Sequence, residues 1–381
     1  MLALAFGLTE AELFGQPGIS ENDSGEPRER TLPVKASTRD EDDEMKRRRL
    51  MRDAAVVAVG GAIGPTLTTL TDAWQASQPR ISGASVSRGM IDDWEDAADA
   101  HAKAARIEPP TVVLAALAAD FAEMAPHLAR RQPDAVRRDL THAAARHAAL
   151  IAGKWTDMGN RRQARRWWGT TRTLVDESGD RLLASWLRRR EALHRAGDPA
   201  EDLAEVLSIA QEARSLAGQR PSAPLVAAVA EEAMIFAAMD RHGEAVTALR
   251  AADDIFDRLP GAEGRFRSVE RELRYGRSLI YSLAGHERSA EEAQGSAEKL
   301  YSPGDQTLPR VRLHRTTLHA RTDPTEAVDE AFRIVADIPP KRWLIRYVAD
   351  VQRVIKTLPE PARALPAVRE LRALAFGDRS V

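Results

Sequence analysis

Histidine pairs are the residues of this chain whose type and spacing come closest to a metal site. His142 and His147 are five residues apart, as are His314 and His319. Metal-binding histidines on one helix are usually four residues apart, because that spacing places both rings on the same face. We therefore expect no metal at either pair, and the chain has no cysteine that could supply thiolate ligands.

Catalytic and cofactor-binding signatures are absent from the sequence. It contains no phosphate-binding glycine loop, no G-x-S-x-G segment and no HExxH segment. The paired carboxylates Glu231–Glu232 and Glu291–Glu292 are adjacent in helical sequence, so their side chains would diverge. The acidic run at 40–44 lacks the glycine of a calcium-binding loop. We predict no catalytic residues, no cofactor and a protein that is not an enzyme.

Arginine runs are the remaining candidates for ligand chemistry. Four arginines within residues 161–166 precede Trp167 and Trp168, and arginine interleaved with aromatic rings can bind phosphate chains. The alternative is that Trp168 packs in the core while the arginines occupy a solvated helix face, and we favour it. We expect the same of the runs at 188–190 and 130–131. The formal net charge of −2 gives no general attraction to nucleic acid.

A recurring pattern of small and aromatic residues indicates paired helices. In three copies a small residue, an aromatic residue and a second small residue follow one another at steps of three and nine. The pattern comprises Ala152, Trp155, Ala164 and Trp168, then Ala233, Phe236, Ala245, Leu249 and Ala252, then Ser278, Tyr281, Ala290 and Ala297. A fixed internal period is typical of helical repeats, and few segments look like strands. The expected fold class is all-α.

These copies resemble tetratricopeptide-like repeats, whose period is about 34 residues. The second helix of each repeat is expected near Ala164, Ala204, Ala245, Ala290 and Ala327. The copies near Ala204 and Ala327 fit poorly, because Arg195 stands where an aromatic residue is expected and Arg315 where a small one is. The resemblance implies an α-solenoid over residues 83–381, with the register of those two repeats left open.

In tetratricopeptide arrays the first helix of each repeat lines a concave groove. Mapped onto the three good copies, the lining is Arg146, Ala149, Gly153, Thr156, Ala227, Ala230, Met234, Ala237, Glu272, Tyr275, Leu279 and Ser282. These residues are mostly small and apolar, which suits an apolar peptide or an amphipathic helix. Candidate partner contacts are Arg146, Thr156, Met234, Tyr275 and Leu279. Another part of the same chain could equally fill the groove.

The ends of the array are expected to be capping helices. A first helix should run from about Val86 to the residues before Pro109, a second from Thr111 to Ala129, and a third should begin near Asp134. A last helix pair, at about 342–358 and 361–376, should close the array. Self-association through these end helices would give a homo-oligomer.

Residues 1–17 (MLALAFGLTEAELFGQP) carry a helix signature, with Thr9 and Glu12 forming a capping box. They resemble the closing helix of lambda-repressor-like (Xre-type) helix-turn-helix domains, and the alternative is an unrelated amphipathic helix. The recognition helix of such a domain is not in this sequence, and we expect it to be encoded upstream. Residues 18–45 are polar and rich in charge, so they are expected to form a disordered linker.

Residues 46–82 combine a basic run with an apolar segment. Lys46 to Arg49 precede the apolar stretch from Ala54 to Leu70, as in a twin-arginine export signal. Asp53, three glycines and Pro65 make this stretch weak for a stable membrane helix. A similar segment joins the Xre-type domain to helical repeats in large actinobacterial regulators, and we favour this reading.

The resemblance implies a cytoplasmic transcriptional regulator. Its helix-turn-helix would bind DNA, while the repeats would bind a peptide or protein partner. DNA binding is expected only if the upstream helix-turn-helix is restored. The alternative is an exported or membrane-anchored helical-repeat adaptor that uses residues 46–70 as its signal.

Overall fold

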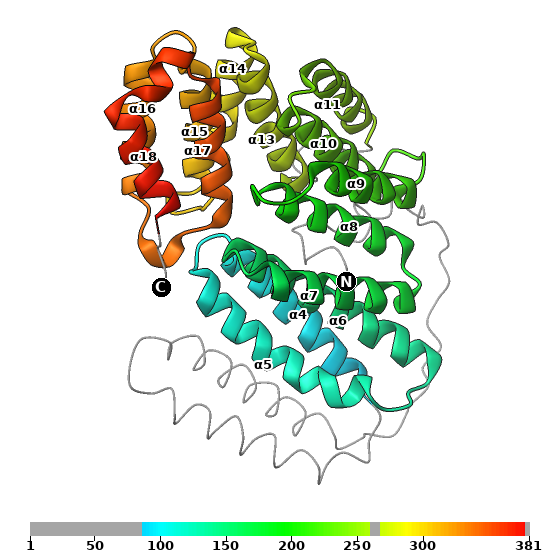
Figure 1. The fold of residues 1–381 in the computed structure, drawn as a ribbon. Coiled ribbons are helices and arrows are strands. Elements are labelled where there is room, and N and C mark those ends of the chain that lie inside the picture. The colour runs from blue at the N-terminus through cyan, green and yellow to red at the C-terminus, as the bar shows by residue number, and fades with distance from the viewer. Residues whose placement is uncertain (1–85, 260–266, 378–381) are drawn as a thin grey trace, which may run out of the picture. The chain divides into compact units, whose positions relative to one another are not determined.

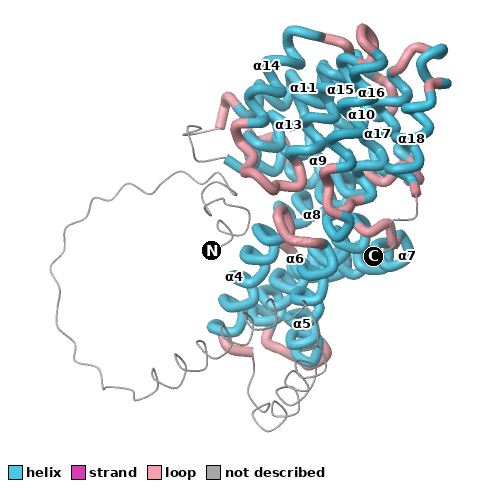
Figure 2. The backbone as a smooth tube through the Cα atoms, turned by 90° about the vertical axis from the view of Figure 1, so that its left-hand side faces the viewer, coloured by secondary structure: helices cyan, strands magenta, loops and turns pink. Residues whose placement is uncertain are grey.

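The computed structural model describes residues 86–259 and 267–377, and every regular element in them is a helix (Figures 1 and 2). No strand occurs within these two ranges, so the all-α prediction is confirmed. The predictions for residues 1–17, 18–45 and 46–82 lie outside the described residues. The α-helices are α4 (Arg88–Ala104), α5 (Pro110–Leu128), α6 (Asp134–Asp157), α7 (Arg161–Ser178), α8 (Arg181–Ala196), α9 (Leu203–Ala217), α10 (Ala223–Ala238), α11 (His242–Phe256), α13 (Arg267–Ala284), α14 (Glu287–Glu298), α15 (Leu308–His319), α16 (Pro324–Ala336), α17 (Ile345–Thr357) and α18 (Pro366–Phe376). Two short 3-10 helices, η2 (Pro340–Arg342) and η3 (Glu360–Ala364), flank α17.

Capping residues in the sequence explain the tight turns between helices. Gly179 ends α7 in the left-handed conformation, with a φ of 71°, which glycine adopts without steric cost. Asp180 follows directly and caps α8, because its Oδ1 accepts a hydrogen bond of 2.8 Å from the backbone amide of Leu183. The chain therefore reverses direction within two residues.

A helix begins within three residues of each of the five predicted positions, and the predicted alanine occupies the same buried position at four of them. Helices α7, α11, α14 and α16 each carry the predicted alanine as their fourth residue, and all four alanines are buried. The exception is α9, where Ala204 is exposed and the fourth residue, Val206, is fully buried. A six-residue turn at 197–202 separates α8 from α9 and shifts the register there.

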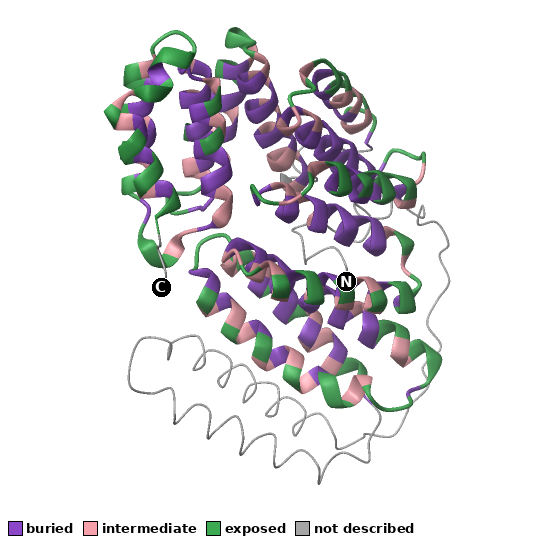
Figure 3. Ribbon diagram, viewed as in Figure 1, coloured by how far each residue is buried: buried purple, intermediate pink, exposed green. Residues whose placement is uncertain are grey.

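Consecutive helices pack as pairs, and the pairs lie beside one another (Figure 1). The first helices of successive pairs also contact each other, in the order α6, α8, α10, α13, α15 and α17. Helices α4 and α5 pack against α6 at the start of this row. An inner helix is therefore covered on several sides, and α8 and α10 are almost entirely buried (Figure 3).

The small residues of the repeat pattern lie at the closest helix contacts. Ala152, Ala233 and Ser278 are fully buried on the first helices, and Ala152 and Ala233 share core clusters with Ala164 and Ala245 of the second helices. The aromatic residues Trp155, Phe236 and Tyr281 are partly buried against the same core clusters, and Trp168 is 2% exposed. The partner alanines Ala164, Ala245, Ala252, Ala290 and Ala297 are at most 4% exposed. Side chains without a γ-carbon allow these backbones to approach closely.

Polar contacts join the first described helices to the last ones. Arg346 of α17 forms an ion pair with Asp157 of α6. After α4, Arg106 bonds Asp305 at 2.9 Å, and its carbonyl accepts a hydrogen bond of 2.9 Å from the amide of Gln306. Residues about 200 positions apart in the sequence are therefore held together.

Helix α5 is the one helix of the described ranges that is long and apolar enough to cross a membrane. Core helices of soluble proteins pass the same test of length and composition, so the length and apolar character of α5 are weak evidence for a membrane span.

Replacing Ala245 by leucine should lower the free energy of unfolding by about 1–3 kcal/mol, because the added carbons enter a site with no free space. The matched change Ala204→Leu places the same side chain on an exposed position and should shift stability by less than about 0.5 kcal/mol. Urea denaturation of both variants measures the difference. Equal losses would contradict the register described for α9 and α11.

Candidate functional site

A cavity of about 290 Å³ lies among the inner helices. Its volume is at the lower end of the range of about 300–1,000 Å³ typical of small-molecule sites. Eight cationic side chains line it, and Glu272 is the one acidic residue among the described residues that line it. The cations are Lys103, Arg106, Lys154, Arg189, Arg190, Arg271, Arg310 and Arg346.

Three buried carboxylates stand behind this lining, and each is shared by two cations. Asp157 pairs with Lys154 at 2.6 Å and with Arg346. Burial alone would raise the pKa of Asp157, but Arg346 and Lys154 hold it well below its usual value. Asp305 and Asp350 are shared in the same way, the first by Arg106 and Arg271, the second by Arg310 and Arg353. The positive charges of the site therefore exceed the negative ones.

The pairing of Arg189 does not remove this excess. Its guanidinium donates two hydrogen bonds to Glu272, of 2.8 and 3.1 Å, and lies 3.9 Å from Glu231. Glu231 is only 1% exposed, and burial raises its pKa to about 8 in spite of Arg189. At neutral pH Glu231 is therefore mostly protonated and contributes little negative charge.

Two cations of the cavity lining lack a hydrogen-bond or ion-pair partner among the described residues, the exposed Lys103 and the half-buried Arg190. Arg190 makes no hydrogen bond and no ion pair with any residue in the described ranges. Burial, together with the neighbouring charge of Arg189, lowers the pKa of Arg190 to about 10. The side chain is still charged at pH 7, so the cavity holds a guanidinium that Glu272 and Asp157 attract only from a distance, without an ion pair.

Aromatic rings fix the planes of three of the guanidinium groups. The carbon at the centre of each guanidinium lies 4.6 to 5.0 Å from a ring centroid. The stacked pairs are Arg189 on Trp186, Arg271 on Tyr301 and Arg310 on Tyr275. Cation–π contacts of this kind hold the fork-shaped donors in place before any ligand arrives.

Two hydroxyl groups at the cavity also lack partners. The hydroxyl of Tyr275 is buried and has no hydrogen-bond partner among the described residues, and the same holds for Ser268. Burial raises the pKa of Tyr275 to about 12, so its hydroxyl keeps its proton at neutral pH. Both groups can donate to a ligand, and the cavity thus offers neutral donors as well as charged ones.

The predicted groove residues divide between the cavity and the core. Met234 and Tyr275 line the cavity, and Leu279 lies in a core cluster. Arg146 is buried in ion pairs with acidic residues of α4, and Thr156 donates its hydroxyl to the carbonyl of Ala152. The lining is charged and aromatic, unlike the small and apolar groove predicted from the sequence.

The prediction that residues 188–190 form a solvated face is wrong. Arg188 and Arg189 are 5% and 1% exposed, because α8 is packed between α6, α9 and α10 and has no free face. Arg188 donates hydrogen bonds to Asp176 and Glu212. By contrast, the arginines of α7 at 162, 165 and 166 are exposed while Trp168 is buried, as predicted.

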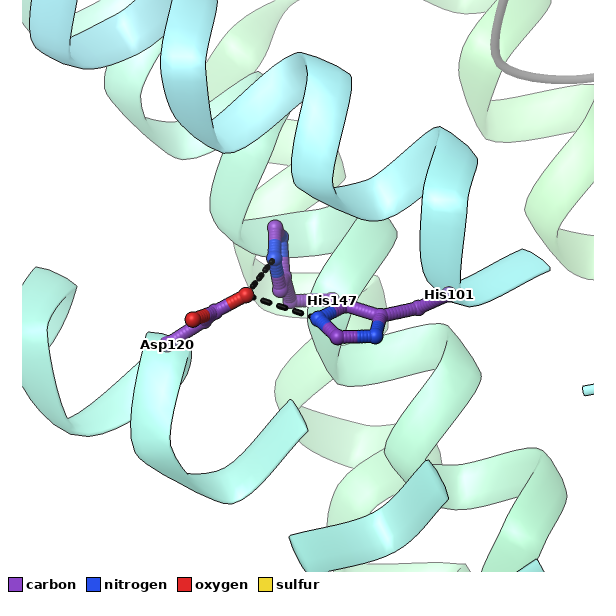
Figure 4. Close-up of side chains that lie close together, drawn as sticks. All are labelled: His101, Asp120 and His147. Carbon is purple, nitrogen blue, oxygen red and sulfur yellow. Dashed lines mark hydrogen bonds and ion pairs between the residues drawn. The ribbon is translucent and has the colours of Figure 1, made fainter. Parts of the chain in front are cut away.

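The histidines of the first pair have different partners. His142 bonds Glu95 at 2.7 Å, whereas His147 faces His101 of α4 and Asp120 of α5 (Figure 4). In the second pair, His314 lies 2.9 Å from the hydroxyl of Ser278. The adjacent carboxylates Glu231 and Glu232 diverge as predicted, since the first faces Arg189 and the second pairs with Arg214 at 3.0 Å.

Comparisons with protein-family models, with curated proteins and with solved structures found no match to this chain. The resemblances to Xre-type regulators and to tetratricopeptide repeats therefore rest on the sequence patterns alone. The geometry of the cavity carries the functional argument.

Replacing Glu231 by glutamine should flatten the pH dependence of stability. Between the unfolded pKa near 4.5 and the folded pKa of about 8, the folded state holds a proton that the unfolded state has released. Stability of the parent protein should therefore fall as pH rises through this window, by up to about 1.4 kcal/mol per pH unit. Glutamine cannot titrate, so the variant should match the parent near pH 5 and exceed it at pH 8.

Urea denaturation at a series of pH values measures this effect. The exposed Glu291→Gln variant is the control and should keep the slope of the parent. Parallel pH profiles for the parent and Glu231→Gln would contradict the buried, mostly protonated state of Glu231.

Proposed function

We propose that the described helices form the ligand-binding part of a regulatory protein, and that the ligand is a small organic anion. The observation that carries the proposal is Arg190, a charged side chain inside the cavity with no ion pair. A half-buried charge without an ion pair is unfavourable, and a bound anion would supply the ion pair that Arg190 lacks. The shared carboxylates Asp157, Asp305 and Asp350 leave further positive charge for the anion to meet.

The donors around the cavity favour a phosphate or carboxylate group. Arginine presents a planar fork that matches both groups, and bonds between charged partners are about twice as strong as neutral ones. The hydroxyls of Tyr275 and Ser268 would complete the shell of donors. Trp186 and Tyr301 offer apolar surface beside the charges, which suits an anion that carries a ring or a short carbon chain.

The size of the cavity argues for a small ligand over a helix. An α-helix with its side chains is about 10 Å across, and a space of about 290 Å³ holds only a short part of one. If the ligand belongs to the peptide or protein partner expected from the sequence, the group that enters the cavity would be an acidic side chain or the C-terminal carboxylate. A free metabolite-sized anion fits the same space.

The paired helices are proposed to be tetratricopeptide-like repeats. The support is the stacking of consecutive pairs and the buried small residues at Ala164, Ala245, Ala290 and Ala327. In this arrangement the ligand would bind on the side of the first helices, as is usual for such arrays. A ligand that bridges α8, α13, α15 and α17 would stabilise the contacts between successive repeats.

We propose binding without catalysis. The cavity brings Lys154, His194 and Tyr275 together, and such groups also occur in active sites. Lys154 is held by Asp157, however, and burial lowers the pKa of His194 to about 3, so it would stay neutral and weakly basic. Neither group is paired with a nucleophile in a way that would activate it.

The regulatory role rests on the resemblance of residues 1–17 to the closing helix of Xre-type domains. In this proposal the helical array senses the anion or its carrier in the cytoplasm, and a helix-turn-helix domain of the regulator contacts DNA. Binding at the cavity would change how firmly the first and last described helices are held together, since Arg106 and Arg346 belong to both the lining and those contacts. No cofactor is part of the proposal.

Pyrophosphate is a suitable probe, because it is compact and multiply charged. It should raise the thermal midpoint of the full-length chain, by an amount that corresponds to about 2.7 kcal/mol when its concentration is a hundred times its dissociation constant. Arg190→Gln should abolish this rise, since it removes the unpaired guanidinium. Without pyrophosphate, the same variant should be at least as stable as the parent, because it buries no unpaired charge.

Differential scanning fluorimetry and isothermal titration calorimetry measure both effects. Arg188→Gln is the matched control, because the adjacent arginine is held by Asp176 and Glu212 away from the cavity. This control should still bind pyrophosphate. Binding that survives Arg190→Gln, or that is lost equally in both variants, would contradict the proposed site.

A further inference from the structure

Three buried side chains from three helices meet at one point, away from the cavity lining (Figure 4). They are His101 of α4, Asp120 of α5 and His147 of α6, and they are 5%, 5% and 0% exposed. The Nε2 atom of His101 lies 2.7 Å from Oδ2 of Asp120, and the Nε2 atom of His147 lies 3.7 Å from the same oxygen. All three potential ligand atoms lie within 4.8 Å of one another.

The hydrogen bond on the far side of His147 fixes its tautomer. Its Nδ1 atom is 3.0 Å from the carbonyl oxygen of Ala143, and a carbonyl can only accept, so Nδ1 carries the proton. In the neutral ring, Nε2 then presents a lone pair toward Asp120. This nitrogen is buried and has no hydrogen-bond partner among the described residues, which is unfavourable in a protein interior.

Metal-binding histidines usually have the same arrangement. Their second ring nitrogen donates to a backbone carbonyl or a carboxylate, which orients the ring and makes the ligating nitrogen more basic. Two imidazoles and one carboxylate form a donor set typical of Zn²⁺ and related divalent ions.

The distances between the donors are close to those of a tetrahedral site. Bonds of about 2.0–2.1 Å to Zn²⁺ place neighbouring ligand atoms about 3.3 Å apart. The observed separations of 2.7 and 3.7 Å lie on either side of that value. Side-chain rotations that move the ligand atoms by less than about 1 Å would equalise the two separations. The metal would then replace the close contact between His101 and Asp120.

We propose that His101, Asp120 and His147 bind one divalent transition-metal ion, with Zn²⁺ as the best match to the nitrogen and oxygen donors. The ion would supply the partner that Nε2 of His147 lacks and would cross-link α4, α5 and α6. Three protein ligands leave one tetrahedral position for a water molecule, and the burial of all three ligands keeps the ion away from bulk solvent. This inference does not depend on the proposed anion site, and either can fail without the other.

Equilibrium dialysis of the untagged full-length chain against Zn²⁺ tests the proposal. One bound ion per chain is expected, with a thermal midpoint that rises in Zn²⁺ and falls again when a chelator is added. His147→Gln should weaken Zn²⁺ binding at least about 10-fold, as loss of a ligand requires. The control is His142→Gln, on the same helix but bonded to Glu95, which should keep the affinity of the parent.

Cobalt provides a second readout that needs no variant. Co²⁺ bound by two imidazoles and a carboxylate should show intense visible d–d bands, and one equivalent of Zn²⁺ should abolish them. Failure of the untagged parent chain to retain Zn²⁺, together with the absence of these bands, would overturn the proposal. It would also be overturned if His147→Gln folded and bound Zn²⁺ as tightly as the parent, since the ion would then sit elsewhere.

Discussion

This structure depends on one electrostatic constraint, which is that the cations around the cavity outnumber the carboxylates that neutralise them. Asp157, Asp305 and Asp350 are each at most 2% exposed, and each holds two positively charged side chains. Removing such a carboxylate from water is unfavourable unless its partners remain close. The helices that supply those partners must therefore stay in contact. Asp157 connects α6 to α17, and Asp305 lies between Arg106 and Arg271, so the contacts between distant helices and the charge of the cavity have one origin.

This arrangement also explains why the cavity should discriminate in favour of anions. The arginines of α7 at 162, 165 and 166 are exposed, and solvent and salt screen their charge. Arg189 and Arg310 are buried and stacked on aromatic rings, so their orientation is set before a ligand binds. Hydrogen bonds to charged groups contribute about 1.5–3 kcal/mol each, more than a neutral bond. An anion at Arg190 would gain from these bonds and remove an unpaired charge at the same time.

Local features of the fold could be read from the sequence, because they depend on neighbouring residues. The helix that ends at Gly179 and the buried alanines at Ala164 and Ala245 follow from turn chemistry and spacing. The register at Ala204 could not be read, since the longer turn before α9 moves the buried position to Val206. A pattern of fixed steps assumes turns of fixed length.

The sites depend on contacts between distant parts of the chain, which a single sequence does not display. In the sequence, the arginine run at 188–190 looks like a solvated helix face. The packing of α8 between other helices, which buries the run, is visible only in the structure. The buried apolar residues that flank the run, Trp186 and Leu187 before it and Ala192 after it, are a local sign of its burial. The cluster of His101, Asp120 and His147 draws one residue from each of three helices, so no spacing rule relates them.

Locating a heavy anion in the structure would test most directly whether the cationic cavity binds anions. Crystals of the full-length chain soaked in tungstate would reveal bound ions by their anomalous scattering. A strong peak is expected inside the cavity, within hydrogen-bonding distance of the guanidinium of Arg190. Peaks confined to the exposed arginines of α7, with none in the cavity, would contradict the proposed anion site.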